Sequence, residues 1–396
     1  MDFAPKALNR AGTRGRISYS ALALVALFSV WYLVIARSTA SQGLRGDFTS
    51  SYMGASLVRE GRLKQLYDYR TQSDWWRSHA SRERVLVPYV RPPYYALIES
   101  PLAALPLPTL FLVNISVLTL LLLGCWFWFA QRLGDEAVVF ASLFLPSVLG
   151  IVSGQDCVLM LVFAVISYHL HSRGRDRWAG VVLALALYKY HLLLLVGPAM
   201  LLGGRRRMFE GFAIAAAVLA VASLCLVGPA GISAYVGLIF RKDLAGLYPS
   251  PQLMPNLNGL LANFRLASTP AVLALSGVTI VAVVVAAWKA PWWRGMAAGM
   301  AGSILIVPHV FVYDLTVLLL GLLLAMKVSK SKLTRCIAAW LCFPLCHMAN
   351  MFDAPWAAAV PLSLALFIFA LSRESRLDRL RGGPQAGAVV DSRATA

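Results

Sequence analysis

The chain has 396 residues, of which 59% are hydrophobic and only 14% are charged, and its mean hydropathy is +0.68. This composition is too apolar for an ordinary soluble domain, so we expect a lipid bilayer as the solvent. The formal net charge of +18 does not indicate a nucleic-acid partner, because the Lys and Arg residues form short clusters between apolar segments rather than one basic face.

The first apolar segment, residues 17–36, follows a basic tail at residues 1–16. A basic start before an apolar stretch is also typical of a signal peptide. This stretch is long, however, and lacks a convincing small-residue cleavage site. Its length matches the roughly 20 residues that cross a bilayer. We interpret it as a retained first helix, with the tail in the cytoplasm.

Residues 38–93 then form a large external loop. Within it, residues 48–61 and 63–76 are amphipathic and are predicted to form short interfacial helices on the membrane surface. Residues 94–106 are too short and too rich in proline to cross the bilayer, so this segment is either re-entrant or interfacial. Residues 109–130 make the return crossing.

Clusters of Lys and Arg indicate which loops face the cytoplasm, because short cytoplasmic loops accumulate these residues. The pattern predicts a multi-pass membrane protein with both termini in the cytoplasm and about 10–13 full or partial crossings. The clearest clusters lie at residues 173–177, 205–207, 327–335 and 373–381, and weaker ones lie at Arg132 and residues 289–294.

Three pairs of short apolar segments have basic residues at both outer ends, so the polar turn inside each pair is predicted to face outward. These turns place Gln155, Lys189, His191 and His309 on the same outer side of the membrane as the first loop. Alternatively, residues 179–202 form one long helix with Lys189 in its middle, but one Arg-rich end would then face outside. The pairs are residues 137–152 with 158–169, 179–186 with 192–202, and 296–307 with 311–326.

The rest of the chain follows the same alternation. A crossing at residues 209–227 leads to a second external loop at residues 228–268, and residues 271–287 return to the cytoplasm. The segments at residues 336–349 and 356–371 form the last pair.

The division of the chain follows from these crossings. Residues 17–372 are predicted to be a single transmembrane domain. The tail at residues 373–396 is charged and then rich in Gly and Ala, and we expect it to be cytoplasmic and disordered.

Ionisable side chains at membrane depth are costly and usually functional. A single one can have a structural role, such as pairing with another charge, but several on one side of the membrane indicate a shared site. We predict no metal and no cofactor, because His169 and His171 border a basic loop and the chain has no CxxC motif. The candidates are Asp47, Arg91, Lys189, His191, His309 and Asp314.

An ordered set of motifs between residues 43 and 320 resembles the polyprenol-phosphate-mannose-dependent α-(1,2)-mannosyltransferase family of the GT-C glycosyltransferase superfamily. The motifs are Asp47, Tyr52-Met53-Gly54-Ala55, Glu60-Gly61, Leu66-Tyr67-Asp68, Pro92-Pro93, Gly154-Gln155, Lys189, Met254-Pro255-Asn256-Leu257-Asn258-Gly259, Pro308-His309 and Tyr313-Asp314.

The resemblance implies an all-α GT-C protein of the bacterial cytoplasmic membrane, in which residues 17–372 form the catalytic domain. It implies transfer of a hexose, mannose, from a polyprenyl-phosphate donor to a glycolipid or glycan acceptor on the non-cytoplasmic face. The acidic residue of the first external loop, here Asp47, would be the catalytic base. Two departures leave the donor sugar and the acceptor open: Lys189-Tyr190-His191 stands where the family commonly has Lys-Pro-Gln, and Arg91 replaces the usual Tyr before the double proline.

The chemistry of the residues supports the same roles. Breaking a sugar–phosphate bond builds positive charge on the sugar and negative charge on the departing phosphate. A carboxylate is needed to deprotonate the acceptor hydroxyl, and cations are needed to hold the phosphate. We therefore expect an inverting displacement with Asp47 as the general base. The expected phosphate-binding residues are Lys189, Arg91 and His309, and further site candidates are Gln155, His191, Tyr313, Asp314 and Asn256.

Two other functions fit part of the pattern. A transporter or flippase of lipid-linked or small polar substrates would also hold ionisable residues near broken helices, but the two halves of the chain show no evident internal repeat. A scaffold for envelope assembly would use Asp47 and Lys189 only structurally.

Overall fold

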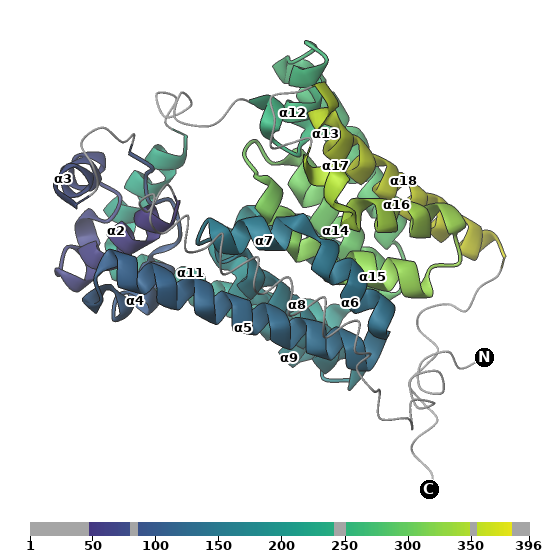
Figure 1. Ribbon diagram of the computed structural model, residues 1–396, viewed down its shortest axis with the longest axis horizontal. Coiled ribbons are helices and arrows are strands. Elements are labelled where there is room, and N and C mark those ends of the chain that lie inside the picture. The colour runs from purple at the N-terminus through teal and green to yellow at the C-terminus, as the bar shows by residue number, and fades with distance from the viewer. Residues whose placement is uncertain (1–46, 80–85, 241–250, 349–354, 382–396) are drawn as a thin grey trace, which may run out of the picture.

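The computed structural model describes residues 47–79, 86–240, 251–348 and 355–381. Every secondary-structure element in these ranges is a helix (Figure 1), which confirms the all-α polytopic prediction. Within the described ranges, four helices are long and apolar enough to cross a bilayer, or six if each of two bent pairs counts as one crossing. The predicted first helix at residues 17–36 lies outside the described residues.

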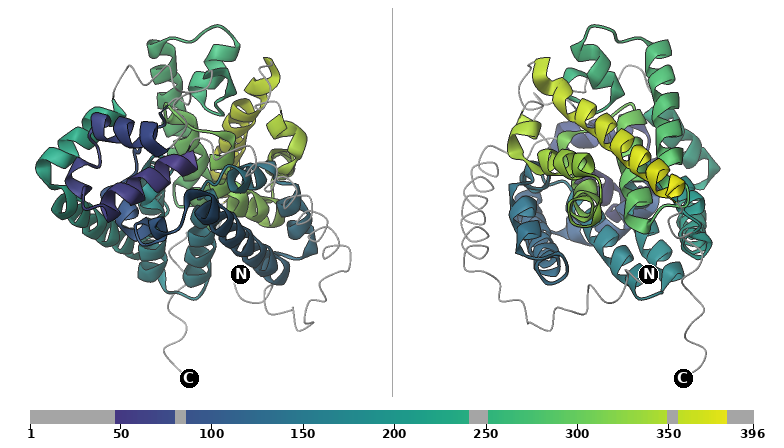
Figure 2. Two further views of the ribbon diagram at one scale, coloured as in Figure 1. Left: turned by 60° about the vertical axis from the view of Figure 1, so that its left-hand side comes forward. Right: turned by 90° about the vertical axis from the view of Figure 1, so that its right-hand side faces the viewer.

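The helices of the first external loop form a group of their own. They pack around a small apolar core that includes Met53, Trp75 and Tyr89, and this core also receives Val227 and Leu238 from a long membrane helix. The first view of Figure 2 shows these purple and blue helices on the opposite side of the molecule from the yellow C-terminal helix. They are α2 (Asp47–Arg59), η1 (Leu63–Gln65), α3 (Tyr69–His79), α4 (Pro93–Glu99) and η2 (Leu102–Ala104).

The first described crossing, α5 (Leu107–Leu133), is followed by a broken pair. Helices α6 (Asp135–Leu143) and α7 (Leu145–Val152) meet at an angle of 53°. The break lies at Phe144, two residues before Pro146, which has no backbone N–H to continue the hydrogen bonds of α6 and is tolerated in the first turn of α7. The chain then turns through residues 153–156 into α8 (Cys157–Ser172).

The segment that contains Lys189 bends sharply. Helix α9 (Asp176–Ala184) continues as η3 (Leu185–Leu193), and this unit meets α10 (Val196–Leu202) at 109°. Lys189 itself has non-helical backbone angles (φ −117°, ψ 54°). The expected break near Lys189 is therefore confirmed, and the alternative of one continuous helix is wrong.

The long helix α11 (Arg206–Ile239) contains a kink at Gly228, where φ is +72°, directly before Pro229. The kink coincides with the predicted end of the crossing. The predicted external loop at residues 228–268 is nevertheless partly helical, because α11 continues beyond the kink and α12 (Leu257–Asn263) follows. Helix α11 packs closely on α9, since a Cβ atom at Gly211 would lie 2.0 Å from the carbonyl oxygen of Arg177.

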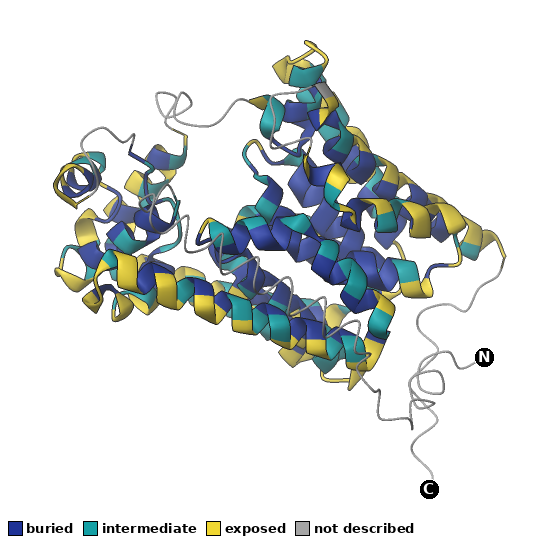
Figure 3. Ribbon diagram, in the orientation of Figure 1, coloured by how far each residue is buried: buried dark blue, intermediate teal, exposed yellow. Residues whose placement is uncertain are grey.

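Helix α14 lies at the centre of the molecule, where Figure 3 shows mostly buried ribbon. It packs against α13, α15 and α18, and its small residues allow this close approach. The C-terminal half comprises α13 (Thr269–Ala287), α14 (Trp292–Ile306), η6 (Val312–Leu318), α15 (Leu319–Val328), α16 (Lys332–Cys342), α17 (Pro344–Met348), η8 (Pro355–Ala358) and α18 (Ala359–Leu380).

Helix α18 extends past residue 372, where the sequence predicted the start of a disordered tail. The extension is held by Arg294 of α14, whose guanidinium donates to Glu374 at 3.0 Å and to Asp378 at 2.8 Å. Glu374 also accepts from the hydroxyl of Ser329 at 2.6 Å. These charged residues of α18 are therefore part of the folded protein.

The sidedness derived from the basic clusters stays a prediction, and Ser153 and Ser172 test it. Both are exposed, and they flank α8, whose 16 residues span about 24 Å. In a chain whose exposed Cys225 and Cys336 are replaced by serine, a membrane-impermeant maleimide should label Ser153→Cys on intact cells. It should label Ser172→Cys only after permeabilisation. Labelling of Ser172→Cys on intact cells would contradict the sidedness inferred from the Lys and Arg clusters.

Candidate functional site

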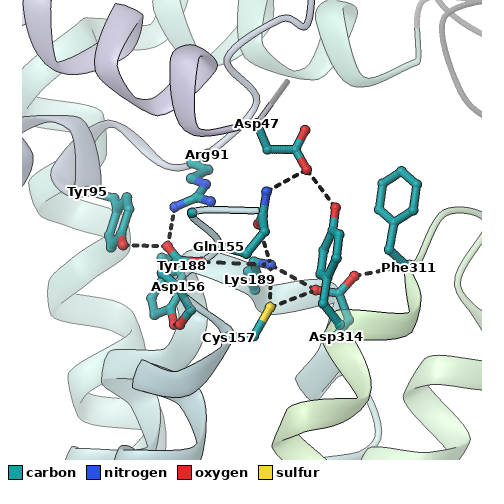
Figure 4. A network of polar contacts seen from close by, with 12 residues as sticks. Asp47, Arg91, Tyr95, Gln155, Asp156, Cys157, Tyr188, Lys189, Phe311 and Asp314 are labelled. Atoms are coloured by element: carbon teal, nitrogen blue, oxygen red, sulfur yellow. Dashed lines mark hydrogen bonds and ion pairs between the residues drawn. The ribbon is translucent and has the colours of Figure 1, made fainter. Parts of the chain in front are cut away.

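Four segments that are distant in the sequence bring polar side chains together (Figure 4). Asp47 begins α2, Gln155 lies in the turn between α7 and α8, Lys189 lies in η3, and Asp314 lies in η6. A chain of hydrogen bonds connects them. The structure thus brings Gln155 and Lys189 together, and the side of the membrane on which they lie stays a prediction.

Asp47 is held at one of its two carboxylate oxygens. Its Oδ2 accepts from Gln155 Nε2 at 2.5 Å and from the hydroxyl of Tyr313 at 2.6 Å. Among the described residues, no side chain or backbone group bonds Oδ1. The residue is only half-buried, whereas Gln155 behind it is buried. Within the described part of the chain, Asp47 therefore keeps one carboxylate oxygen outside this hydrogen-bond network.

Lys189 lies deeper in the same network and is 7% exposed. Its Nζ is 2.8 Å from Asp314 Oδ1, 3.1 Å from Gln155 Oε1 and 3.1 Å from the sulfur of Cys157. An ammonium group has three hydrogens to donate, and these three contacts use them all. Asp156 Oδ1, at 3.7 Å from Nζ, adds a second negative charge nearby.

The turn that carries Gln155 depends on a glycine. Gly154 has a φ of +68°, a conformation that side chains with a Cβ atom rarely adopt. A Cβ atom there would also lie 2.9 Å from Phe48 and Phe111. The Gly154 carbonyl accepts from Asn114 of α5 at 3.2 Å. The turn is thus fixed against both α2 and α5, and it holds Gln155 beside Asp47.

Arg91 joins the network through Asp156, a residue that the sequence analysis did not select. The guanidinium forms an ion pair with Asp156 Oδ2, and the hydroxyl of Tyr95 donates to the same oxygen at 2.5 Å. The guanidinium also lies over the ring of Tyr95, with its central carbon 5.1 Å from the ring centroid. Asp156 directly follows Gln155 in a polar turn between apolar segments, and that position was a signal that could have identified it.

The two predicted histidines lie close to the carboxylates. His309, in the turn between α14 and η6, and His191, in η3, both interact electrostatically with Asp314, and His309 also with Asp47. Burial lowers the pKa of His309, although the negative charges of Asp314 and Asp47 oppose this effect. The imidazole of His309 is therefore biased toward its neutral form in the protein alone.

Asn256 has a different position from the other candidates. It is fully buried and caps α12, accepting from the backbone N–H of Gly259 at 2.8 Å. Its Nδ2 donates to the carbonyl of Val307 at 2.8 Å. Asn258 similarly donates to the carbonyl of Pro308 at 3.2 Å. This motif therefore braces the turn that carries His309 and shows no contact with Asp47 or Lys189.

Comparison with known proteins gives one match. The model of glycosyltransferase family 87 matches residues 89–311, which is more than half of the chain. The matched range includes Arg91, Gln155, Lys189 and His309, whereas Asp47 lies outside it. Neither a curated protein nor a solved structure matches the chain.

Glu99, at the end of α4, gives the site a testable pH dependence. Burial raises its pKa from 4.5 to about 7, with the charge of Arg91 opposing the change. Because the folded state then binds this proton more tightly than the unfolded state, stability should fall as the pH rises from 4.5 to 7. Glu99→Gln should therefore be more stable than the parent at pH 8, by about 1–3 kcal/mol, but not below pH 4.5.

Thermal unfolding in detergent at several pH values measures this difference. Glu60→Gln is the matched control, because Glu60 is an exposed carboxyl of the same external helices. Identical pH profiles for Glu99→Gln and the parent would contradict the assignment.

Proposed function

The chain belongs to glycosyltransferase family 87 and is a membrane glycosyltransferase, and from this premise we propose the reaction that it performs. It transfers a hexose, mannose, from a polyprenyl-phosphate carrier to a hydroxyl of a glycolipid or glycan acceptor. The reaction takes place on the non-cytoplasmic face of the membrane. The observation that carries the proposal is the half-buried carboxylate of Asp47, in one network with the cation Arg91. This carboxylate is held at Oδ2, and none of the described residues bonds its Oδ1.

Asp47 acts as the general base. Its Oδ1 takes the proton of the acceptor hydroxyl as that oxygen attacks the anomeric carbon of the donor. The bond between this carbon and the phosphate oxygen breaks, and the polyprenyl phosphate leaves with the electron pair. A single displacement inverts the anomeric configuration. Phosphate is a good leaving group, so no second carboxylic acid is required.

Arg91 and His309 bind the donor phosphate in this proposal. The guanidinium has five N–H donors, and its ion pair with Asp156 uses NH1, so other donors remain for phosphate oxygens. His309 is biased toward the neutral form in the protein alone, and a bound phosphate would favour its protonation. Lys189 was also predicted to bind the phosphate, but its three hydrogens already have acceptors.

The surroundings of Arg91 suit a lipid carrier. Leu97, Ile98 and Leu102, on α4 and η2, are large apolar side chains that are exposed in the protein. They directly precede the membrane helix α5. An apolar surface at this position supports contact with lipid, and the polyprenyl chain could pass from it to the phosphate-binding residues.

A transporter of the same lipid-linked sugar is the competing function, and one assay separates the two. Purified protein in detergent is given polyprenyl-phosphate mannose and a mixture of membrane glycolipids, and free polyprenyl phosphate is measured. The enzyme should release it in proportion to the protein added. Movement of intact donor across a reconstituted bilayer, with no release of polyprenyl phosphate, would instead identify a transporter. A parallel set of polyprenyl-phosphate hexoses identifies the sugar.

Substitution of Asp47 tests the proposed base. Asp47→Asn keeps the shape but removes the proton acceptor, so the turnover should fall by about 10²–10⁴-fold while the KM for the donor changes little. If Asp47 only caps α2, Asn serves equally well and transfer survives. Turnover and thermal stability of this variant decide between the two roles. A stable Asp47→Asn protein with near-normal transfer would refute the mechanism.

A further inference from the structure

We propose that Gln155 and Lys189 are positioning residues, which act together to direct Oδ1 of Asp47 toward the acceptor hydroxyl. This inference rests on the proposed function, because it assumes that Asp47 is the base. In this proposal Lys189 helps to orient the general base and does not bind the donor phosphate.

Lys189 determines which way the Gln155 amide points. An ammonium group can only donate hydrogen bonds, so the group that faces Lys189 Nζ at 3.1 Å must be the amide oxygen of Gln155. The amide NH₂ then faces Asp47, and it donates to Oδ2 at 2.5 Å. The reverse orientation would place NH₂ against the ammonium and the amide oxygen against the carboxylate. Both of these contacts would be repulsive.

Asp314 keeps Lys189 charged and in place. Its Oδ1 accepts from Lys189 Nζ at 2.8 Å, and its Oδ2 accepts from the backbone N–H of Phe311 at 2.9 Å. A buried ammonium is stable only when it is paired and hydrogen-bonded. Because Asp314 is fixed by the backbone of η6, the ammonium has a fixed position as well. The orientation of Gln155 therefore derives from a rigid element.

Tyr313 supplies the second donor to the same oxygen of Asp47, at 2.6 Å. It precedes Asp314 in the chain, so one element, η6, both donates to the carboxylate and carries the counter-ion of Lys189. Two donors from different segments prevent rotation of the carboxylate. They also occupy Oδ2, which leaves Oδ1 as the oxygen for the acceptor hydroxyl.

Loss of these donors should change the pH dependence of transfer. Hydrogen bonds to a carboxylate favour its ionised form, so removing one makes the base harder to ionise. The acidic limb of the pH–rate profile then moves to higher pH. The charged and titratable groups around Asp47 are Tyr313 and Asp314 of η6, Lys189 of η3, His309 of the preceding turn, and the Arg91–Asp156 pair.

The test uses two substitutions of Gln155 that preserve its length. Gln155→Met removes the donor and should lower kcat by roughly 10- to 100-fold, with the acidic limb about one pH unit higher and the donor KM unchanged. Gln155→Glu places a carboxylate against Asp47, so the two groups must share a proton at low pH. The acidic limb of the pH–rate profile of Gln155→Glu should therefore lie at a still higher pH than that of Gln155→Met, and activity should recover as the pH rises.

Matched controls separate this role from a structural one. Gln72 is another buried glutamine with hydrogen bonds to the backbone of Leu66 and Tyr89, and it lies in the external helices. Gln72→Met should lower thermal stability and leave the acidic limb of the pH–rate profile unchanged. The Gln155→Met shift should also persist in a His309→Gln background, because the shift belongs to Asp47.

Lys189 is tested by separating kcat from KM. Lys189→Met combined with Asp314→Asn avoids leaving an unpaired buried carboxylate. We expect this double variant to reproduce the lower kcat and the shifted limb of Gln155→Met, with an unchanged KM for polyprenyl-phosphate mannose. If instead the KM for the donor rises and the acidic limb of the pH–rate profile stays where it is in the parent, Lys189 binds the phosphate and the inference is wrong.

The remaining outcomes are equally decisive. One outcome is that Asp47→Asn abolishes transfer while folded Gln155→Met keeps the kcat and the acidic limb of the pH–rate profile of the parent. In that case the positioning role is wrong and the proposed base stands. If Asp47→Asn retains transfer, the proposed base itself is wrong.

Discussion

The buried ammonium of Lys189 is the interaction on which the site depends. An isolated charge at this depth would be strongly unfavourable, so the fold must provide acceptors around it. It does so from separate segments: Gln155 and Cys157 flank the start of α8, and Asp314 comes from η6. The break in the helix at Lys189 allows its side chain to enter this space. Lys189 also acts on Asp47 at the start of α2, because the Gln155 side chain that it contacts donates to the Asp47 carboxylate.

The site combines a rigid interior with an accessible edge. Lys189, Asp314 and Gln155 are buried, whereas Asp47 is half-buried and belongs to helices that pack outside the main group of membrane helices. Arg91 connects the two parts through Asp156. In the proposed reaction, this arrangement would let a lipid-linked donor and a polar acceptor approach the carboxylate from different environments.

Much of this organisation could be predicted from the sequence, because bilayer crossings and basic clusters are properties of local composition. The non-helical break at Lys189, the kink at Gly228 and the approach of Gln155 to Lys189 agree with where the apolar segments end. Pairing between side chains could not be predicted in the same way. Asp156 as the partner of Arg91, and Arg294 as the residue that orders the end of α18, depend on tertiary packing. For the same reason the sequence did not reveal that Asn256, which matched a motif, braces the turn that carries His309.

The most direct test of the account is an experimental structure of the protein with polyprenyl phosphate bound. The account predicts phosphate density within hydrogen-bond distance of the Arg91 guanidinium and the His309 imidazole. Oδ1 of Asp47 should face the position where the anomeric carbon of the donor would lie, and Lys189 should keep its contacts with Asp314 and Gln155. Phosphate bound directly to Lys189, or at a position remote from Asp47, would contradict the account.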